Sequence, residues 1–207
     1  MVSNTPVRLD DLQIERYSRQ IVLREIGAVG QAQLLDARVA IAGTGTAAQR
    51  ALGYLAAAGV GTLAAARALH GAVDPAQRDV TLEGPCSGAA GAPFDALVVD
   101  GEDPGLLPPA RRTFWIAAGR AGEVPPCAAC AAAALPPLAT PAAELAGARD
   151  AVLGTVVATE VVKALVDVGT PLRGHVVSYD PDHASITTTA VAARPGCAAC
   201  APVAVEG

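Results

Sequence analysis

Short apolar segments alternate with segments of helical periodicity along this chain, and the alternation predicts an α/β fold. Residues 38–42 carry β-branched side chains at alternate positions, which is typical of a buried strand. An apolar helix follows over residues 49–58, and we expect it to end at Gly59. Further strands are predicted at 61–66, 93–100, 112–119, 175–180 and 185–191, with a short helix at 141–148 and a buried helix at 155–165. The last two strands are expected to form a C-terminal β-hairpin.

The first forty residues are more polar and predict short helices. Asp10 followed three residues later by Gln13 has the spacing of a capping box at the start of a helix. Arg16 and Arg19 are three residues apart, so on a continuous helix they share a face. Residues 31–36 are expected to complete a helix that leads into the first strand.

A glycine-rich turn joins the first strand to its helix. The segment from Gly43 through Gly45 to Ala48 fits the pattern G-x-G-x-x-G/A, which places a phosphate at the N-terminus of a helix. Gly43 permits the tight turn, Gly45 lets the backbone approach a ligand, and the small Ala48 lets the helix pack close to the strand. These three residues are the predicted cofactor-binding positions.

Four of the five cysteines form two C-x-x-C pairs and predict a metal site. Four thiolates are the ligand set of a closed, tetrahedral structural zinc site, which would tie the tail of the chain back to its middle. A redox-active C-x-x-C is the alternative. The fifth cysteine, Cys86, is interpreted as a buried or tolerated thiol. The predicted zinc ligands are Cys127, Cys130, Cys197 and Cys200.

Charge and composition exclude two classes of partner. The formal net charge is −5 and the pI about 5.1, which argues against the basic surface that nucleic-acid binding needs. The most apolar stretch, residues 151–168, contains Glu160, Lys163 and Asp167, so it is a core helix and not a membrane span. Glu160 and Lys163 are expected to pair with each other. No basic segment precedes an apolar run near residue 1, so we expect a cytoplasmic protein.

Several of these segments together resemble the ThiF/MoeB/HesA family, the bacterial relatives of the ubiquitin-activating enzymes. The resemblance implies a single ThiF/MoeB-like α/β domain over residues 1–207, with a Rossmann-like, mostly parallel sheet. Within it we expect a helical N-terminal arm (1–36), a nucleotide-binding half (37–125) and a zinc-tied C-terminal part (126–207). The matching segments are Arg16-Tyr17-Ser18-Arg19-Gln20-Ile21, Gly30-Gln31, residues 42–48 and residues 54–61.

The resemblance also implies an activity and its residues. Such proteins use ATP and Mg²⁺ to adenylate the C-terminal carboxylate of a small ubiquitin-like or sulfur-carrier protein. Arg19 matches the arginine that reaches the ATP triphosphate of the other subunit across a dimer, and a guanidinium suits that contact. Asp103 matches the carboxylate that binds the magnesium. Relatives carry the same pair of C-x-x-C knuckles at matching places.

Other residues of the family's nucleotide site are missing. The second predicted strand ends in Ala65-Ala66-Arg67-Ala68, where relatives place acids that bind the ribose hydroxyls. The S-N-L-x-R-Q segment and a following lysine are absent, and Pro104 stands where relatives have Asn. Each charge-assisted phosphate contact contributes about 1.5–3 kcal/mol. Losing three of them should weaken ATP binding on the order of 10³-fold or more.

Three functional hypotheses follow. The first is a non-catalytic, zinc-stabilised subunit or scaffold, which pairs with an active adenylating enzyme, a carrier protein or a biosynthetic enzyme as a homodimer or heterodimer. The alternative is a minimal but active adenylyltransferase that acts on a carrier protein or peptide. A third is a dinucleotide-binding protein in which Arg67 faces a 2′-phosphate.

The segment around Asp103 is rich in residues that favour turns, so Asp103 could also belong to an ordinary surface turn without a role in magnesium binding.

Overall fold

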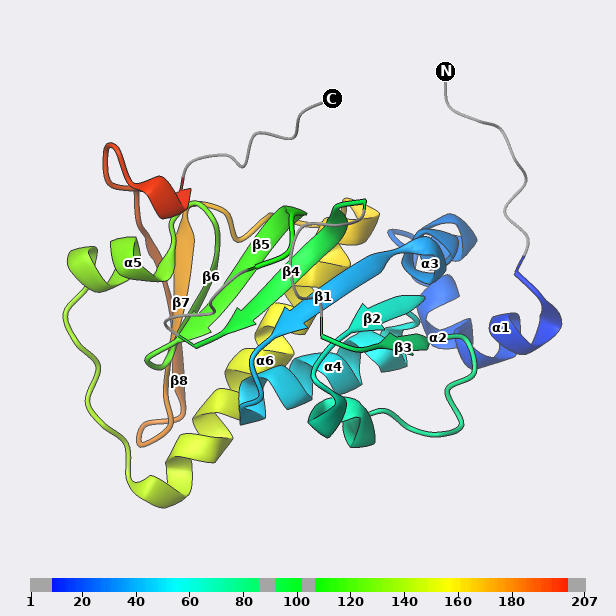
Figure 1. The fold of residues 1–207 in the computed structure, drawn as a ribbon, viewed down its shortest axis with the longest axis horizontal. Helices are drawn as coiled ribbons and strands as arrows, with labels where there is room; N and C mark the ends of the chain where they lie inside the picture. The colour runs from blue at the N-terminus through cyan, green and yellow to red at the C-terminus, as the bar shows by residue number, and fades with distance from the viewer. Residues whose placement is uncertain (1–8, 86–91, 102–106, 201–207) are drawn as a thin grey trace.

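The computed structural model describes residues 9–85, 92–101 and 107–200, which form one mixed sheet covered by helices (Figure 1). The helices are α1 (Asp11–Arg16), α2 (Ser18–Ile21), α3 (Gly27–Asp36), α4 (Thr46–Ala58), α5 (Ala128–Ala134) and α6 (Ala143–Val166), with 3₁₀ turns η1 (Arg67–Ala72) and η2 (Ala198–Cys200). The strands are β1 (Arg38–Ala42), β2 (Thr62–Ala64), β3 (Thr81–Glu83), β4 (Phe94–Asp100), β5 (Ala110–Ala117), β6 (Arg120–Glu123), β7 (His175–Asp180) and β8 (Ser185–Ala190).

The sheet has eight strands in the order β3-β2-β1-β4-β5-β6-β7-β8. The first five of these pair in parallel, and β6, β7 and β8 continue the sheet with antiparallel pairing. This confirms the predicted α/β class, the mostly parallel sheet and the C-terminal hairpin. None of the helices in the described residues combines the length and apolarity needed to cross a membrane.

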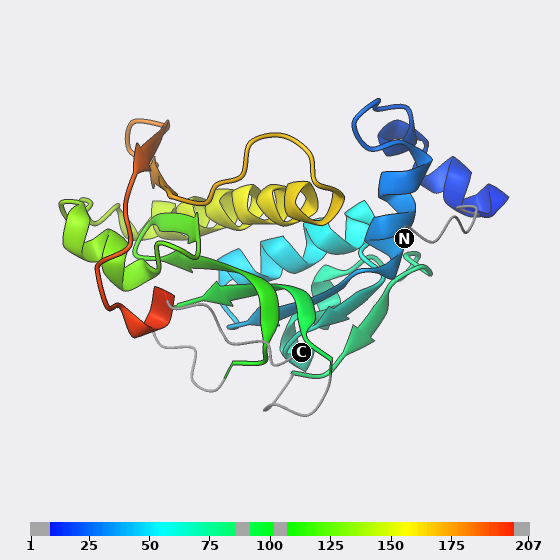
Figure 2. The ribbon, with the colours of Figure 1, turned by 90° about the horizontal axis from the view of Figure 1, so that it is seen from above.

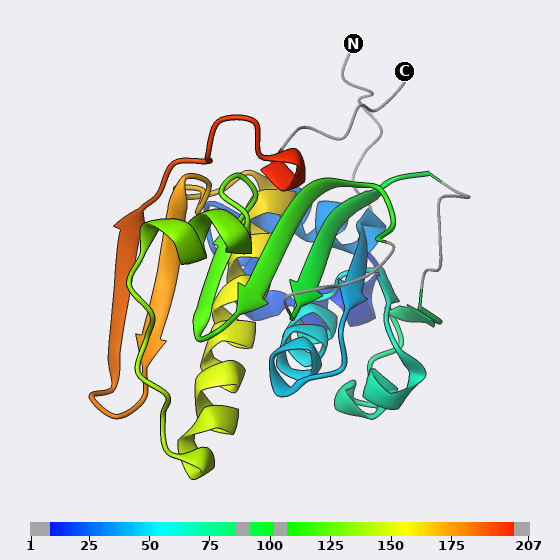
Figure 3. The ribbon, with the colours of Figure 1, turned by 60° about the vertical axis from the view of Figure 1, so that its left-hand side comes forward.

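Helices α4 and α6 lie side by side on one face of the sheet (Figure 2). They can approach closely because small residues meet at their contact. A Cβ on Gly154 of α6 would lie 2.3 Å from the carbonyl oxygen of Ala47 in α4, so only glycine fits there. Ala48 and Leu153 are fully buried in the same apolar cluster. Helix α5 covers the opposite face, where Trp115 and Ala131 belong to a second cluster (Figure 3).

The predicted element bounds hold best where the local signal is strong. Strand β1 is confirmed residue for residue, and α4 ends before Gly59, which has φ +87°. The two helices predicted at 141–148 and 155–165 are one helix, α6, because the residues between them continue in the helical conformation. Strands β3 and β6 were not predicted. Both are short, and β6 reads Arg-Ala-Gly-Glu without a β-branched residue, so only pairing with neighbouring strands makes them extended.

Candidate functional site

The glycine-rich turn lies where the direction of chain progression through the sheet reverses. Strand β2 follows β1 on one side, whereas β4 pairs with β1 on the other. Ligands of open α/β sheets bind outside the carboxyl ends of strands at such a switch point. Gly43 and Gly45 leave the carboxyl end of β1, and Asp100 ends β4 beside them.

The carboxylate of Asp100 packs directly onto this turn. Its Oδ2 accepts a hydrogen bond from the backbone N–H of Ala48 at 3.0 Å, so it caps α4. A Cβ on Gly45 would lie 2.6 Å from the same oxygen, and a Cβ on Gly43 would lie 2.6 Å from the Asp100 carbonyl oxygen. Gly43 is therefore required by the approach of the Asp100 backbone and by its φ of +119°, whereas a side chain at Gly45 would require the Asp100 carboxylate to move. Burial raises the pKa of Asp100, and the hydrogen bond from Ala48 partly opposes that shift.

Sequence reasoning assigned the site carboxylate to Asp103, which lies outside the described residues. Asp100 was missed, although its position at the end of an apolar strand was a usable signal, because carboxyl ends of parallel strands converge on the switch point. A second carboxylate, Asp150 of α6, lies near enough to raise the pKa of Asp100 further. Asp150 forms an ion pair with Arg149 at 3.1 Å.

A small cavity of about 210 Å³ lies beside the turn, between the ends of β1, β2 and β4. Among the described residues that line it, Thr44 has the only polar side chain and none is charged. Its walls include Ala42, Ala66 and Leu97. The end of β2 thus presents alanine where a nucleotide site would place an acid for the ribose. Arg67 begins η1 and is exposed.

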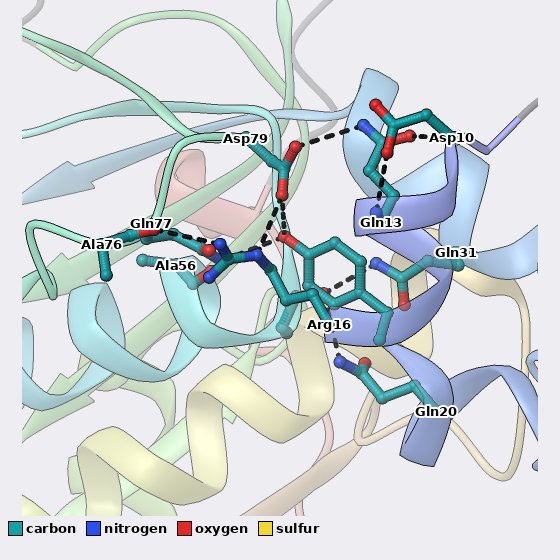
Figure 4. A network of polar contacts seen from close by, with 11 residues as sticks. Asp10, Gln13, Arg16, Gln20, Gln31, Ala56, Ala76, Gln77 and Asp79 are labelled. Carbon is teal, nitrogen blue, oxygen red and sulfur yellow. Dashed lines mark hydrogen bonds and ion pairs between the residues drawn. The ribbon is translucent and has the colours of Figure 1, made fainter.

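The Arg-Tyr-Ser-Arg-Gln segment fixes the N-terminal helices to the rest of the protein (Figure 4). Arg16 pairs with Asp79 at 3.3 Å and donates to the Ala76 carbonyl at 3.1 Å. The hydroxyl of the buried Tyr17 donates to the Asp79 carboxylate at 3.2 Å. Burial, together with the charge of Asp79, raises the pKa of Tyr17 to about 12. Asp10 and Gln13 form the predicted capping box, and Gln13 also reaches Asp79.

Arg19 lies in α2 and, unlike Arg16, has no ion-pair partner among the described residues. Tyr17 separates α1 from α2, so Arg16 and Arg19 do not continue one helix face as predicted. Gln20 donates to the Ala58 carbonyl, which places α2 beside the C-terminal end of α4. Arg19 is exposed, and no ion pair in the described part of the chain includes it. The glycine turn lies at the other end of α4, a 13-residue helix that spans about 20 Å.

The four predicted cysteines meet at one point, with their sulfur atoms all within 4.8 Å of one another. The distance is 3.7 Å from Cys127 Sγ to Cys197 Sγ and 3.6 Å from Cys130 Sγ to Cys200 Sγ. A disulfide needs about 2.05 Å, whereas sulfurs bound about 2.3 Å from a tetrahedral zinc are about 3.8 Å apart. The cluster could hold a metal ion, and its geometry is consistent with structural zinc.

Backbone groups around the cluster support the thiolate form. Cys127 is the N-cap of α5, and η2 contains Cys200. The N–H of Arg194 donates to Cys130 Sγ at 3.3 Å and lowers the pKa of that thiol to about 6. Burial raises the pKa of Cys127 and Cys200, and a cation bound by these sulfur atoms would favour their thiolate form.

Some known proteins match a short segment of this chain, and others match nearly its whole length. No family model matches the chain. The SAMP-activating enzyme E1 of Haloferax volcanii is 49% identical over 55 residues, which are 27% of this chain and 20% of that enzyme. This chain therefore matches only about a fifth of that relative's length. The sulfur carrier protein adenylyltransferase of Thermus thermophilus is 26% identical over a comparison that covers 91% of each of the two chains.

Solved structures agree on the architecture. The crystal structure of E. coli MccB has a TM-score of 0.61 and 15% sequence identity, and it covers 93% of this chain and 74% of MccB. The same enzyme has been solved with ATP. The fold is that of the E1-like adenylyltransferases. The chain is a short relative of the ThiF/MoeB-type sulfur carrier adenylyltransferases, which confirms the resemblance inferred from its sequence.

Proposed function

We propose that this protein is a non-catalytic, zinc-stabilised member of an adenylating complex. It pairs with an active adenylating enzyme, a carrier protein or a biosynthetic enzyme. The observation that carries the proposal is that none of the described residues lining the cavity beside the glycine turn is charged. A triphosphate needs cations or a bound metal to offset its charge, and each such contact contributes about 1.5–3 kcal/mol. Asp100, which packs on the glycine turn, and Asp150, which lies close enough to raise the pKa of Asp100, would repel a phosphate there.

The position of Arg19 supports a role in a partner's site. The side chain is exposed at the C-terminal end of α4, about 20 Å from the glycine turn at its other end. Such an arginine is too far away to contact a phosphate in its own subunit. Its neighbours Arg16, Tyr17 and Gln20 hold the segment in place, so a guanidinium is presented on a fixed surface. In a homodimer or heterodimer, Arg19 would reach the phosphates bound to the other subunit.

In this proposal the cysteine cluster binds a zinc ion that stabilises the fold and takes no part in catalysis. We assign zinc to it because four thiolates with tetrahedral sulfur separations leave no open coordination position for catalysis. The ion would join the start of α5 to η2, so the last described turn of the chain is held against the sheet.

A second candidate function is a minimal but active adenylyltransferase. The match to the Thermus sulfur carrier protein adenylyltransferase over 91% of both chains favours it, as does the switch-point position of the turn. MccB, which shares the fold, has been solved with ATP and with the peptide MccA. In this alternative, ATP–Mg²⁺ binds at the turn, Asp103 holds the magnesium, and the substrate is the C-terminus of a carrier protein or peptide.

Calorimetric titration of the zinc-loaded protein with Mg²⁺–ATP separates the two candidates. The proposal predicts no binding below millimolar ATP, and micromolar binding would make the active adenylyltransferase the better account. NADPH in the same titration tests the dinucleotide alternative at Arg67.

The partner role is tested by adding the protein to an active family member encoded nearby and measuring ATP–pyrophosphate exchange. We expect a complex and a rate increase that Arg19→Ala abolishes, while Arg24→Ala, an exposed arginine just beyond α2, preserves it. Absence of both a complex and a rate change would overturn the partner role.

A further inference from the structure

A second cavity, of about 300 Å³, lies between β5 and α5. Helix α5 covers the sheet face opposite α4 and α6 (Figure 3). Trp115 and Ala117 of β5 form one wall, and the alanine-rich face of α5, including Ala128 and Ala132, forms the other. These alanines leave the space open because they have no side-chain atoms beyond Cβ. Both of these walls are therefore apolar, and the cavity opens to solvent at the exposed Ala118, Ala129 and Ala132.

Arg120 supplies the only charge among the described residues that line this cavity. Its side chain belongs to a residue that is 6% exposed. Its Nε donates to Ser178 Oγ at 3.3 Å, and its Nη2 donates to the Pro136 carbonyl. Both partners are neutral, and no ion pair in the described part of the chain includes Arg120. Burial lowers the pKa of Arg120, with no carboxylate to oppose the shift.

A buried guanidinium without an anion is unusual, because buried charges are generally paired. Arg112, a partly buried arginine of the same protein, is paired in the usual way. Arg112 makes two hydrogen bonds, of 2.8 and 3.0 Å, to the carboxylate of Glu123. Arg120 makes two of the five N–H contacts that a guanidinium can make, so donors remain for an anion that enters the cavity.

We propose that this cavity binds a monocarboxylate with a slender apolar stem, whose carboxylate pairs with Arg120 while its stem lies between Trp115 and the alanines of α5. A carboxylate matches the planar fork of arginine and carries one charge, which one cation can neutralise. A phosphate would bring further charge into a cavity whose other walls are apolar. The ligand can be a free carboxylic acid or the C-terminal carboxylate of a peptide, and the site is independent of nucleotide binding at the glycine turn.

Trp115 makes the proposal directly measurable, since it is the only tryptophan of the chain and lines the cavity. The full-length, metal-loaded protein is titrated with hexanoate and with acetyl-trialanine, and Trp115 fluorescence is followed. Saturation by hexanoate identifies a free acid as the ligand type, and saturation by the peptide identifies a chain terminus. Hexanamide and the peptide amide should bind at least about tenfold more weakly, because they lack the charge-assisted contact. Failure of both acids to bind, or equal binding of acids and amides, would overturn the proposal.

Two pairs of variants separate this site from nonspecific effects. Ala132→Leu adds bulk to the cavity wall and should weaken acid binding at least about tenfold, whereas Ala133→Leu, on the same helix but not part of the cavity lining, should leave it unchanged. Arg120→Gln should remove the preference for acid over amide, and Arg111→Gln, an arginine 72% exposed on the same strand pair, should retain it. If Arg120→Gln does not fold, the comparison of Ala132→Leu with Ala133→Leu and the comparison of acids with amides still test whether the cavity binds a carboxylate. Undiminished acid binding in Ala132→Leu would contradict the assignment.

Discussion

The hydroxyl of Tyr17 donates a hydrogen bond to Asp79 at 3.2 Å and thereby joins the N-terminal helices to the loop before β3. The same hydroxyl accepts a hydrogen bond from Gln77 at 3.0 Å, and Gln77 also donates to the Ala56 carbonyl at the end of α4. Three segments that are distant in sequence therefore meet at one phenol. Gly59 is part of this contact, because a Cβ there would lie 2.7 Å from the Tyr17 ring.

Tyr17→Phe should lower the free energy of unfolding by about 1–2 kcal/mol, since it removes two buried hydrogen bonds. Tyr54→Phe, at a tyrosine 54% exposed, is the matched control and should change little. Urea unfolding measured by circular dichroism tests both variants. An equal loss in the two would show that the buried network contributes nothing specific.

The same tyrosine predicts a dependence on alkaline pH. The folded-state pKa of Tyr17 is about 12, above the ordinary value of 10.0. A group whose pKa is raised on folding contributes stability that is complete below the unfolded pKa and is lost as the pH rises through the folded pKa. Wild-type stability should therefore fall between about pH 10 and 12 more steeply than that of Tyr17→Phe. Parallel pH profiles for the two proteins would contradict this.

Asp100→Ala should cost about 1 kcal/mol of stability, because α4 loses the side chain that caps Ala48. Asp100→Asn keeps an oxygen acceptor and should cost less. Because the pKa of Asp100 is raised on folding, the stability linked to its protonation is present at acid pH and lost as the pH rises through the folded value. The advantage of wild type over Asp100→Asn should thus shrink from acid to neutral pH. Asp36→Asn, at the exposed end of α3, serves as control in the same thermal unfolding series.

Glu123→Gln should be among the most destabilising single changes, at about 3–5 kcal/mol. Glu123 has no exposed side-chain surface, and its carboxylate neutralises Arg112 and, at 3.5 Å, Arg173. Removing its charge leaves a partly buried guanidinium without an anion. Glu160→Gln breaks the predicted and confirmed pair with Lys163 on α6 and should cost about 0.5 kcal/mol. Chemical denaturation that ranks the two variants in the opposite order would refute the argument.

Removal of the metal should lower the melting temperature on the order of 10 °C, because α5 and η2 are then no longer joined. Cys130→Ser should lose the bound ion, and Cys86→Ser, outside the cluster, should keep it. Metal content measured by elemental analysis is expected to be one zinc per chain in wild type. A cluster that retains its ion in Cys130→Ser would contradict the ligand assignment.

Local residue patterns were sufficient to predict most helices and strands of this protein. The alternation in residues 38–42, the apolar helix after it and the glycine that ends it determine β1 and α4 almost to the residue. The two C-x-x-C pairs predicted a cluster that the fold brings together within 4.8 Å. These features depend on neighbours a few residues apart, so they can be recognised without the fold.

Other features depend on contacts between distant segments and became visible only in the tertiary structure. Asp100 belongs to the glycine turn because parallel strands bring their carboxyl ends together, and β3 and β6 exist because neighbouring strands supply their hydrogen bonds. Arg16 and Arg19 look alike in the sequence and both are exposed, yet Asp79 pairs with Arg16, whereas no ion pair among the described residues includes Arg19. The sequence alone determined the α/β class and the cysteine cluster, whereas long-range packing decided which charged side chains are paired or buried. That division arises because backbone preference is local, while burial and charge pairing depend on residues that only folding brings together.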